Sequence, residues 1–171
     1  FTATIDDTGT GGSSITDAKY KVTQGVYDSG LQSLTLSGGS GAIRSVSQVI
    51  SNTIWNALVD GDFTLYVQGT DVGTTGSANI TLRKDTTGPG ATIDSPAAGT
   101  HIKNPPTLTA TITDPVPGST DVTDAKYKVN QGSYTSDWYT ASLSGSGVTR
   151  AASQTIDSTV WSSLTDGDFT L

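Results

Sequence analysis

The sequence predicts an all-β protein that contains two copies of one β-sandwich domain, and two observations lead to this prediction. The first is alternation of apolar and polar residues over residues 63–68 and 78–83, on either side of a Gly- and Thr-rich loop. Such period-two alternation between turn residues is typical of half-buried antiparallel strands. The second is a stretch near the start of the chain that recurs in its second half. About seven short strands in each copy indicate a Greek-key β-sandwich.

The composition favours strands and turns and excludes several classes of function. The 171 residues include 30 Thr and 21 Ser, and all 16 acidic residues are Asp. Thr favours strands, whereas Asp favours turns. A net charge of −7 argues against a nucleic-acid partner, which needs clustered Lys and Arg. Because the chain has no Cys and no apolar run of about 20 residues, we expect no disulfide, no thiolate metal site and no membrane insertion.

The internal duplication is the strongest signal in the sequence. Residues 17–22 recur letter for letter as residues 124–129, an offset of 107 (124 − 17), and 10 of 14 positions are identical when the match is extended to residue 30. Further along, residues 60–65 match residues 166–171, an offset of 106 (166 − 60). The one-residue deletion falls in a Gly/Ser loop, where a change of length costs little.

The alignment of the two copies predicts the domain boundaries. Copy one is expected over residues 1–86, a linker over 87–90 and copy two over 91–171. Residues 1–5 align with residues 108–112, so copy one is expected to lack its first strand. Copy two stops level with Leu65 and is expected to lack its final strands. We therefore expect the sequence to be a slice of a longer array, with the missing strands supplied by the rest of that chain or by a neighbouring subunit.

Apart from the two strands named above, alternation within each copy predicts further short strands and one helical turn. The Ile54, Trp55 and Leu58 spacing suits a single helical turn that closes one end of the sandwich, and the second copy repeats it around Trp161. Strands are also expected over residues 1–5, 18–22, 34–36, 46–50 and 91–94.

Short motifs in the chain resemble a known family. The motifs are Asp60-Gly61 followed by Phe63 and Leu65, Asp71 before a Gly-containing turn, and the linker from Asp85 to Pro89. On these residues the chain resembles the bacterial immunoglobulin-like repeats of large extracellular surface proteins and adhesins. The resemblance implies immunoglobulin-like Greek-key sandwiches in an extracellular stalk, fibre or adhesin.

Aspartates beside glycines and beside the linker are candidate ligands for a structural calcium ion. Ca²⁺ takes six to eight oxygen ligands, which carboxylates and turn carbonyls can supply. The alternative interpretation is that the Asp-Gly pairs are plain turns, with Asp accepting local backbone hydrogen bonds and Gly taking positive φ. The candidate ligands are Asp60, Asp62, Asp85, Asp94, Asp166 and Asp168.

Aromatic residues offer two kinds of candidate contact. Trp55 and Trp161 recur in the same helical turn, which favours core packing over a sugar-stacking role. Asp137, Trp138 and Tyr139 form a cluster that copy one lacks, since Leu31 stands at the position of Trp138. An exposed cluster of this kind would suit contact with a glycan or a protein, and the alternative is structural packing.

The sequence predicts no catalytic residue and no enzymatic activity. His101 is the single histidine and is expected to be a surface residue, because the chain has no Cys, Glu or second His to complete an ordinary zinc site. Asn79-Ile-Thr81 fits the acceptor pattern for N-glycosylation, although it falls in an expected strand.

The function predicted from these observations is a structural or stalk module of an extracellular, cell-surface repeat protein such as a fibre, filament or adhesin. Its expected partners are neighbouring repeats or copies of itself in a fibre. No cofactor is expected apart from the candidate structural Ca²⁺. Two alternatives stay open at this point: a ligand-binding adhesin module that contacts glycan or protein, and a spacer in a secreted enzyme.

Overall fold

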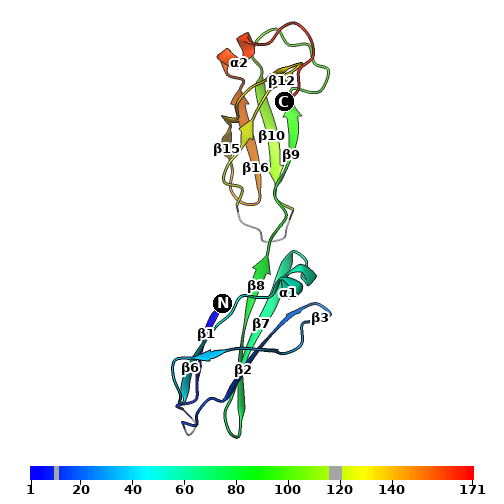
Figure 1. The fold of residues 1–171 in the computed structure, drawn as a ribbon. Helices are drawn as coiled ribbons and strands as arrows, with labels where there is room; N and C mark the ends of the chain where they lie inside the picture. The colour runs from blue at the N-terminus through cyan, green and yellow to red at the C-terminus, as the bar shows by residue number, and fades with distance from the viewer. Residues whose placement is uncertain (10–11, 116–120) are drawn as a thin grey trace. The chain divides into compact units, whose positions relative to one another are not determined.

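The computed structural model describes residues 1–9, 12–115 and 121–171. The chain divides into two compact units, Phe1–Thr86 (unit 1) and Thr87–Leu171 (unit 2). Each unit is built from antiparallel strands and also contains a short helix (Figure 1). The prediction of an all-β protein with antiparallel sheets is confirmed.

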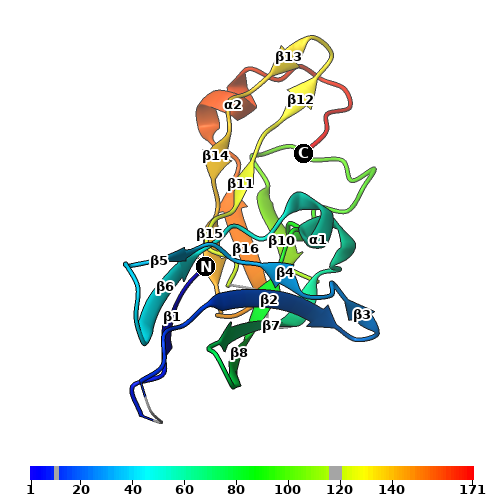
Figure 2. The same cartoon turned by 60° about the horizontal axis from the view of Figure 1, so that its bottom comes forward.

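Unit 1 contains two sheets and the helix α1 (Asn52–Ala57). Its strands are β1 Thr2–Asp6, β2 Asp17–Gln24, β3 Tyr27–Asp28, β4 Gln32–Ser33, β5 Leu36–Ser37, β6 Ile43–Ser47, β7 Gly61–Thr70 and β8 Thr75–Lys84. One sheet has the order β1-β6-β5, and the other has the order β3-β2-β7-β8 with β4 also paired to β2 (Figure 2).

The β7–β8 hairpin is the longest ladder of unit 1. It runs in unbroken register from Gly61 opposite Lys84 to Thr70 opposite Thr75. Gly61 opens β7 with a φ of 128°, a conformation that favours glycine. At the other end, an oxygen of Asp71 accepts hydrogen bonds from the backbone N–H groups of Gly73 and Thr74 and so closes the turn.

The core of unit 1 receives side chains from both sheets and from the helix. On β2 the alternating residues Ala18, Tyr20 and Val22 are buried, and Val46 of β6 and Ile54 of α1 pack in the same cluster. The predicted helical turn is confirmed, and it begins where the Ser51 hydroxyl accepts a hydrogen bond from the backbone N–H of residue 54. The two sheets therefore enclose one apolar core in a sandwich-like arrangement.

Unit 2 repeats most of these elements and adds a strand. Its elements are β9 Gly90–Ser95, β10 Thr107–Thr113, β11 Lys126–Tyr127, β12 Asn130–Gln131, β13 Tyr134–Thr135, β14 Tyr139–Thr140, β15 Ser142–Ser144, β16 Thr149–Thr155 and α2 Ser158–Ser162. The largest sheet has the order β15-β16-β10-β9, and two-stranded pairs join β11 to β14 and β12 to β13.

The core of unit 2 uses the residues that the alignment matches to the core of unit 1. Tyr127 and Val129 are buried, and so are the matched residues Tyr20 and Val22 of unit 1. Val160 of α2 is buried like its counterpart Ile54 of α1. Asp157 caps α2 by accepting a hydrogen bond from the backbone N–H of Thr159 at 2.8 Å. The same alternation therefore builds the same kind of interior in both units.

Two predicted strands are shifted in the structure. The strand expected over residues 34–36 is instead two short strands, β4 and β5, because Leu34 lies in the core between them. The strand expected over residues 46–50 is β6, which ends at Ser47, since Ser51 already caps α1 and residues 48–50 lead into that cap.

The strand predicted over residues 78–83 is confirmed as part of β8, but its apolar face is not half-buried as expected. Ala78 is exposed and Ile80 keeps 55% of its surface exposed. Their neighbours across the ladder, Val67 and Leu65 on β7, are more buried. The inner face of β8 is therefore only partly covered within unit 1.

Candidate functional site

The first predicted cation ligands, Asp60 and Asp62, make contacts within unit 1. Asp60 Oδ1 accepts hydrogen bonds from the Thr86 hydroxyl at 2.7 Å and from its backbone N–H at 3.0 Å. Asp62 Oδ1 lies 2.7 Å from two nitrogens of the Arg83 guanidinium. Gly61 between them has positive φ, as the turn interpretation expects. The two carboxylates thus fasten the end of β8 to the start of β7.

The other predicted cation ligands are Asp85 of unit 1 and Asp94, Asp166 and Asp168 of unit 2. Asp94 Oδ2 accepts a hydrogen bond from the Thr111 hydroxyl at 2.8 Å, and Asp85 is exposed. Asp166 and Asp168 are exposed at the edge of a cavity of about 810 Å³ in unit 2. Among residues 1–9, 12–115 and 121–171, no three acidic or histidine side chains are grouped as a metal site requires. A structural cation stays a prediction.

The predicted contact cluster of unit 2 has one strongly exposed member. Trp138 keeps 62% of its surface exposed, and the Lys128 ammonium lies 5.1 Å from the centre of its ring. Asp137 is exposed beside it. Tyr139 instead stacks on Tyr127, with ring centres 5.6 Å apart. The cluster therefore presents an indole and a carboxylate to solvent, with the tyrosine ring turned to the interior.

Burial affects the protonation of the Tyr139 hydroxyl. It raises the pKa of the Tyr139 hydroxyl above its usual value, and the negative charge of Asp157 adds to the effect. The hydroxyl therefore stays protonated at neutral pH and can donate a hydrogen bond.

The two tryptophans of the helical turns pack alike. Trp55 meets Phe63 edge-on at 6.2 Å, and Trp161 meets Phe169 edge-on at 5.9 Å, both with an interplanar angle of 87°. Edge-on packing of this kind stabilises aromatic pairs. Both tryptophans are partly buried, which agrees with the packing interpretation.

The single histidine and the glycosylation motif lie on the surface. His101 is exposed, as expected. Asn79 is exposed on β8, opposite Tyr66 of β7. The modification of Asn79 stays a prediction.

Sequence reasoning missed Lys84, which is buried at the end of β8 with 7% of its surface exposed. Its ammonium donates hydrogen bonds to the carbonyl oxygens of Trp55 and Leu58, both at 2.8 Å, and lies 5.0 Å from the centre of the Trp55 ring. The residue therefore satisfies carbonyl groups at the end of α1 and ties the helix to β8. The alternation along β8 could have indicated this burial. Lys84 stands two residues after Leu82, in the same series as Ala78 and Ile80, so its side chain is expected on the apolar face of the strand.

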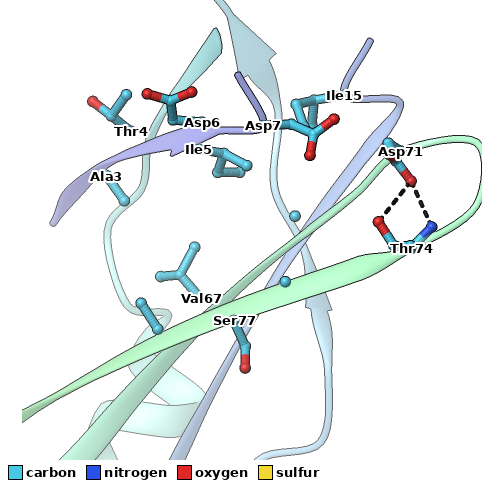
Figure 3. Close-up of a pocket in the computed structure, with 13 residues that line it drawn as sticks. Ala3, Thr4, Ile5, Asp6, Asp7, Ile15, Val67, Asp71, Thr74 and Ser77 are labelled. Carbon is cyan, nitrogen blue, oxygen red and sulfur yellow. Dashed lines mark hydrogen bonds between the residues drawn. The ribbon is translucent and has the colours of Figure 1, made fainter. Parts of the chain in front are cut away.

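A cavity of about 390 Å³ lies in unit 1 between β1 and the β7–β8 hairpin. Ala3, Ile5 and Val67 point into it (Figure 3). Apolar side chains thus line the space between the two sheets.

Three aspartates, Asp6, Asp7 and Asp71, are among the residues that line this cavity. The backbone N–H groups of Gly73 and then Thr74 lower the pKa of Asp71. The hydroxyl and then the N–H of Thr8 lower the pKa of Asp6. Both carboxyl groups are therefore ionised at neutral pH, and the lining of the cavity carries negative charge.

Comparison with family models, curated proteins and solved structures finds no match for this chain. No helix in the described part of the chain has the length and apolar character that a bilayer crossing requires.

Proposed function

We propose that the chain is a structural module, with two immunoglobulin-like β-sandwiches forming part of a stalk, fibre or filament of an extracellular surface protein. The duplicated sequence, the antiparallel sheets around apolar cores and the family motifs support this proposal. A module of this kind must hold its strands together when its ends are pulled apart.

The observation that carries the proposal is the way in which unit 1 fastens the segment that leaves it. At the end of β8, Lys84 is bonded to two carbonyl groups beside α1, and two residues later Thr86 is bonded twice to Asp60. Tension that enters through Thr86 therefore meets four hydrogen bonds, two of which come from a buried ammonium. Hydrogen bonds to charged groups are stronger than neutral ones.

Single-molecule force spectroscopy on the whole chain tests this proposal. We expect one unfolding event for each unit, and we expect Lys84→Met and Asp60→Ala to lower the force of the unit 1 event alone. Asp166→Ala, which changes the matched aspartate of unit 2, is the control and should leave the unit 1 event unchanged. An unfolding force of unit 1 that neither Lys84→Met nor Asp60→Ala alters would contradict a role of these contacts in resisting tension.

The location has its own test. An antibody raised against the chain should stain intact cells of its source. Staining that requires permeabilised cells would contradict an extracellular stalk.

A second function, contact with glycan or protein, is favoured by one observation, the 62% exposure of Trp138 beside Lys128 and Asp137. Tryptophan is enriched among the residues that contribute most to binding at protein interfaces. A glycan array probed with the chain and with Trp138→Ala measures this function. We expect binding to defined glycans that the variant loses, and equal or absent binding by both proteins would contradict contact with glycan.

A further inference from the structure

The two units differ sharply in the short segment that runs from the end of β13 to the start of β14. Over residues 124–134, nine of eleven residues are identical to residues 17–27 of unit 1. Over residues 135–139, four of five differ from residues 28–32. The difference is thus concentrated in one loop on a shared framework, and loops that a rigid scaffold positions often carry binding residues.

One of these differences leaves a lysine without a carboxylate partner. In unit 1, Lys21 forms a 2.8 Å ion pair with Asp28. Lys128 matches Lys21, but Thr135 stands where unit 1 has Asp28. Among residues 1–9, 12–115 and 121–171, the Lys128 ammonium forms no ion pair. No described side chain therefore neutralises its positive charge.

A second difference places an indole beside this lysine. Trp138 stands where unit 1 has Leu31, and the Lys128 ammonium lies 5.1 Å from the centre of its ring. In the β11–β14 ladder Tyr127 pairs with Tyr139, so Lys128 and Trp138 face each other one residue further along (Figure 2). Both differences act on the same lysine. Together they produce an ammonium without an acidic partner in contact with an exposed aromatic ring.

The exposure of the indole is a property of its position in the unit. Trp138 is 62% exposed, and Leu31 is 50% exposed in unit 1, where β7 lies beside β2. The position thus stays open when the neighbouring strand of the sheet is present. Its side chain is not needed to fill the core, which leaves the indole available to a ligand.

Polar side chains share the outward face with the indole. Tyr127 and Val129 are buried, so the residues that alternate with them, and the residues paired with those, face outward. These outward residues carry ammonium, amide or hydroxyl groups. They are Lys126, Lys128, Asn130, Thr135 and Thr140.

Negative charge nearby works against an anionic ligand and makes Lys128 decisive. Asp137 is exposed next to Trp138, and the chain carries a net charge of −7. Lys126, the other outward lysine, is paired with Asp124 at 3.2 Å. Among the described residues of this face, Lys128 is therefore the ammonium that no carboxylate neutralises.

This set of groups matches a pyranose sugar that bears a carboxylate. The C–H groups on one face of a pyranose ring form a flat apolar patch, which an exposed indole can cover. The hydroxyls of the sugar suit threonine hydroxyls, because each can both donate and accept. A carboxylate suits the ammonium, and such charge-assisted hydrogen bonds are stronger than neutral ones. An acidic peptide offers carboxylates but no flat ring that carries hydroxyls.

The present contact of Lys128 couples charge to stacking. A cation–π contact is weak at an exposed site, whereas a hydrogen bond between an ammonium and a carboxylate is stronger. A carboxylate on the ligand can therefore draw the ammonium away from the ring. The face of the indole that the ammonium covers then becomes free to pack against the sugar.

We propose that Trp138 and Lys128, with the outward hydroxyls beside them, bind an acidic sugar, either a uronic acid or a sialic acid. The sugar ring packs on the indole, and its carboxylate accepts a hydrogen bond from the ammonium. The inference rests on the second function proposed above, contact with glycan or protein, and names the chemical class of its ligand. The site belongs to unit 2 alone, since Leu31 and the Lys21–Asp28 ion pair stand at the matched positions of unit 1.

The probes are two matched pairs of saccharides added to the whole chain. Tri-galacturonate is compared with its methyl ester, which keeps the rings but has no charge, and sialyllactose is compared with lactose. We expect the acidic member of at least one pair to bind about tenfold or more tightly than its neutral partner, and the pair that responds identifies the acid. Titration calorimetry gives the affinities, and the indole N–H signal of Trp138 in NMR should shift while those of Trp55 and Trp161 do not.

The outcomes separate this inference from the function on which it rests. Equal binding of the acidic and neutral members of both pairs would overturn the need for charge and leave contact with glycan standing. Absence of binding to all four saccharides would overturn the inference, while the glycan array still decides contact with other glycans.

Surface variants test the two named side chains. Trp138→Ala should abolish binding, and Lys128→Met should weaken binding of the acidic saccharide about tenfold without affecting the neutral one. Thr135→Asp, which restores the carboxylate of unit 1, should weaken it similarly because it neutralises Lys128. Lys21→Met is the matched control in unit 1 and should change nothing. Equal affinities of Lys128→Met and Lys21→Met for the acidic saccharide would overturn the proposal.

An acidic polypeptide is the rival ligand. An oligo-aspartate peptide supplies carboxylates without a sugar ring, and we expect it to bind at least about tenfold more weakly than the acidic saccharide. Binding of this peptide as tight as that of the saccharide, and lost in Lys128→Met, would assign the site to an acidic polypeptide and overturn the proposal.

Discussion

Gln24 of unit 1 and Gln131 of unit 2 hold the same loop in the same way. The Gln24 amide group bonds to both backbone groups of Val59, at 2.9 and 2.8 Å, and Gln131 bonds to both backbone groups of Thr165 at 2.8 Å. The loop residue differs between the units, but its backbone does not. Contacts directed at the backbone are therefore kept while the side chains around them change.

Lys21 and Lys128 occupy matched positions three residues earlier and contact different partners. Lys21 forms a 2.8 Å ion pair with Asp28, whereas Thr135 stands at the matched position in unit 2 and Lys128 lies over the Trp138 ring instead. A contact between two side chains changes when one partner changes. The units thus share an interior and differ in the surface that they present.

The largest expected effect concerns how closely the cores of the two units are packed around matched isoleucines. Ile156 is 2% exposed and donates its backbone N–H to Pro106, whereas its counterpart Ile50 is only partly buried. Ile156→Ala should lower the free energy of unfolding of unit 2 by about 3 kcal/mol because it leaves a cavity in a closed core. Ile50→Ala should cost unit 1 about half as much. Calorimetry measures both, and equal losses would contradict the difference in packing.

The next effect concerns a close approach in unit 1. An ideal Cβ on Gly69 would clash with Cγ2 of Ile5, so the Ile5 side chain must shift to accept any side chain there. Gly69→Ala should destabilise unit 1 by about 2 kcal/mol through overpacking. Gly76, directly opposite on β8, has open space around it, so Gly76→Ala is the matched control. Equal denaturation midpoints for the two variants would show that a side chain at residue 69 does not overpack unit 1.

Lys84→Met tests the buried ammonium. The methionine side chain is also unbranched and only one atom shorter, but it loses both hydrogen bonds to the carbonyl groups of Trp55 and Leu58, which should cost unit 1 about 1.5 kcal/mol. Urea denaturation measures the loss. Lys19→Met, which removes a 3.3 Å surface ion pair with Asp17, is the control and should have little effect, since exposed pairs contribute little. A cost for Lys84→Met no greater than that of the control would refute the role of Lys84.

The smallest effect is a pH dependence confined to one unit. The hydrogen bond from Lys21, and then that from the Gly30 N–H, lower the pKa of Asp28 below 3.8. The carboxylate therefore contributes stability above about pH 4, and this contribution is lost as the pH falls through the lowered pKa. Asp28→Asn should remove it, as carboxyl NMR titration combined with unfolding at pH 3 and pH 7 would show.

The converse change tests the same pair in unit 2. Thr135→Asp should create an ion pair with Lys128, and the introduced carboxylate should titrate below 3.8. An ordinary pKa for that carboxylate would show that Lys128 stays over Trp138.

Much of the fold could be predicted from the sequence because it follows from local pattern. Alternation placed residues 18–22 and 63–68 in strands with the correct inner face, and the 54, 55, 58 spacing predicted the helical turn. Burial was less predictable. The alternation of Ala78 and Ile80 shows which face is apolar, but it does not show whether another strand covers that face.

The candidate sites depended still more on long-range contacts. Lys84 lies 26 residues from Leu58, and Thr86 lies 26 residues from Asp60, so neither bond follows from local spacing. The exposure of Trp138 likewise depends on packing around it, since Tyr139 next to it turns inward. Sequence pattern therefore named Asp60 and Trp138 as residues of interest without showing what they contact.

The three tryptophans give the chain a built-in optical signal. Trp55 and Trp161 are partly buried against phenylalanine rings, whereas Trp138 is 62% exposed and belongs to unit 2. Fluorescence from Trp138 should lie at longer wavelength and should be quenched first by iodide or acrylamide. With Trp138→Phe as the reference, the quenched fraction reports the surface of unit 2 while the remaining emission follows the two helical turns. The surface of unit 2 can thus be observed in the intact chain without an added label.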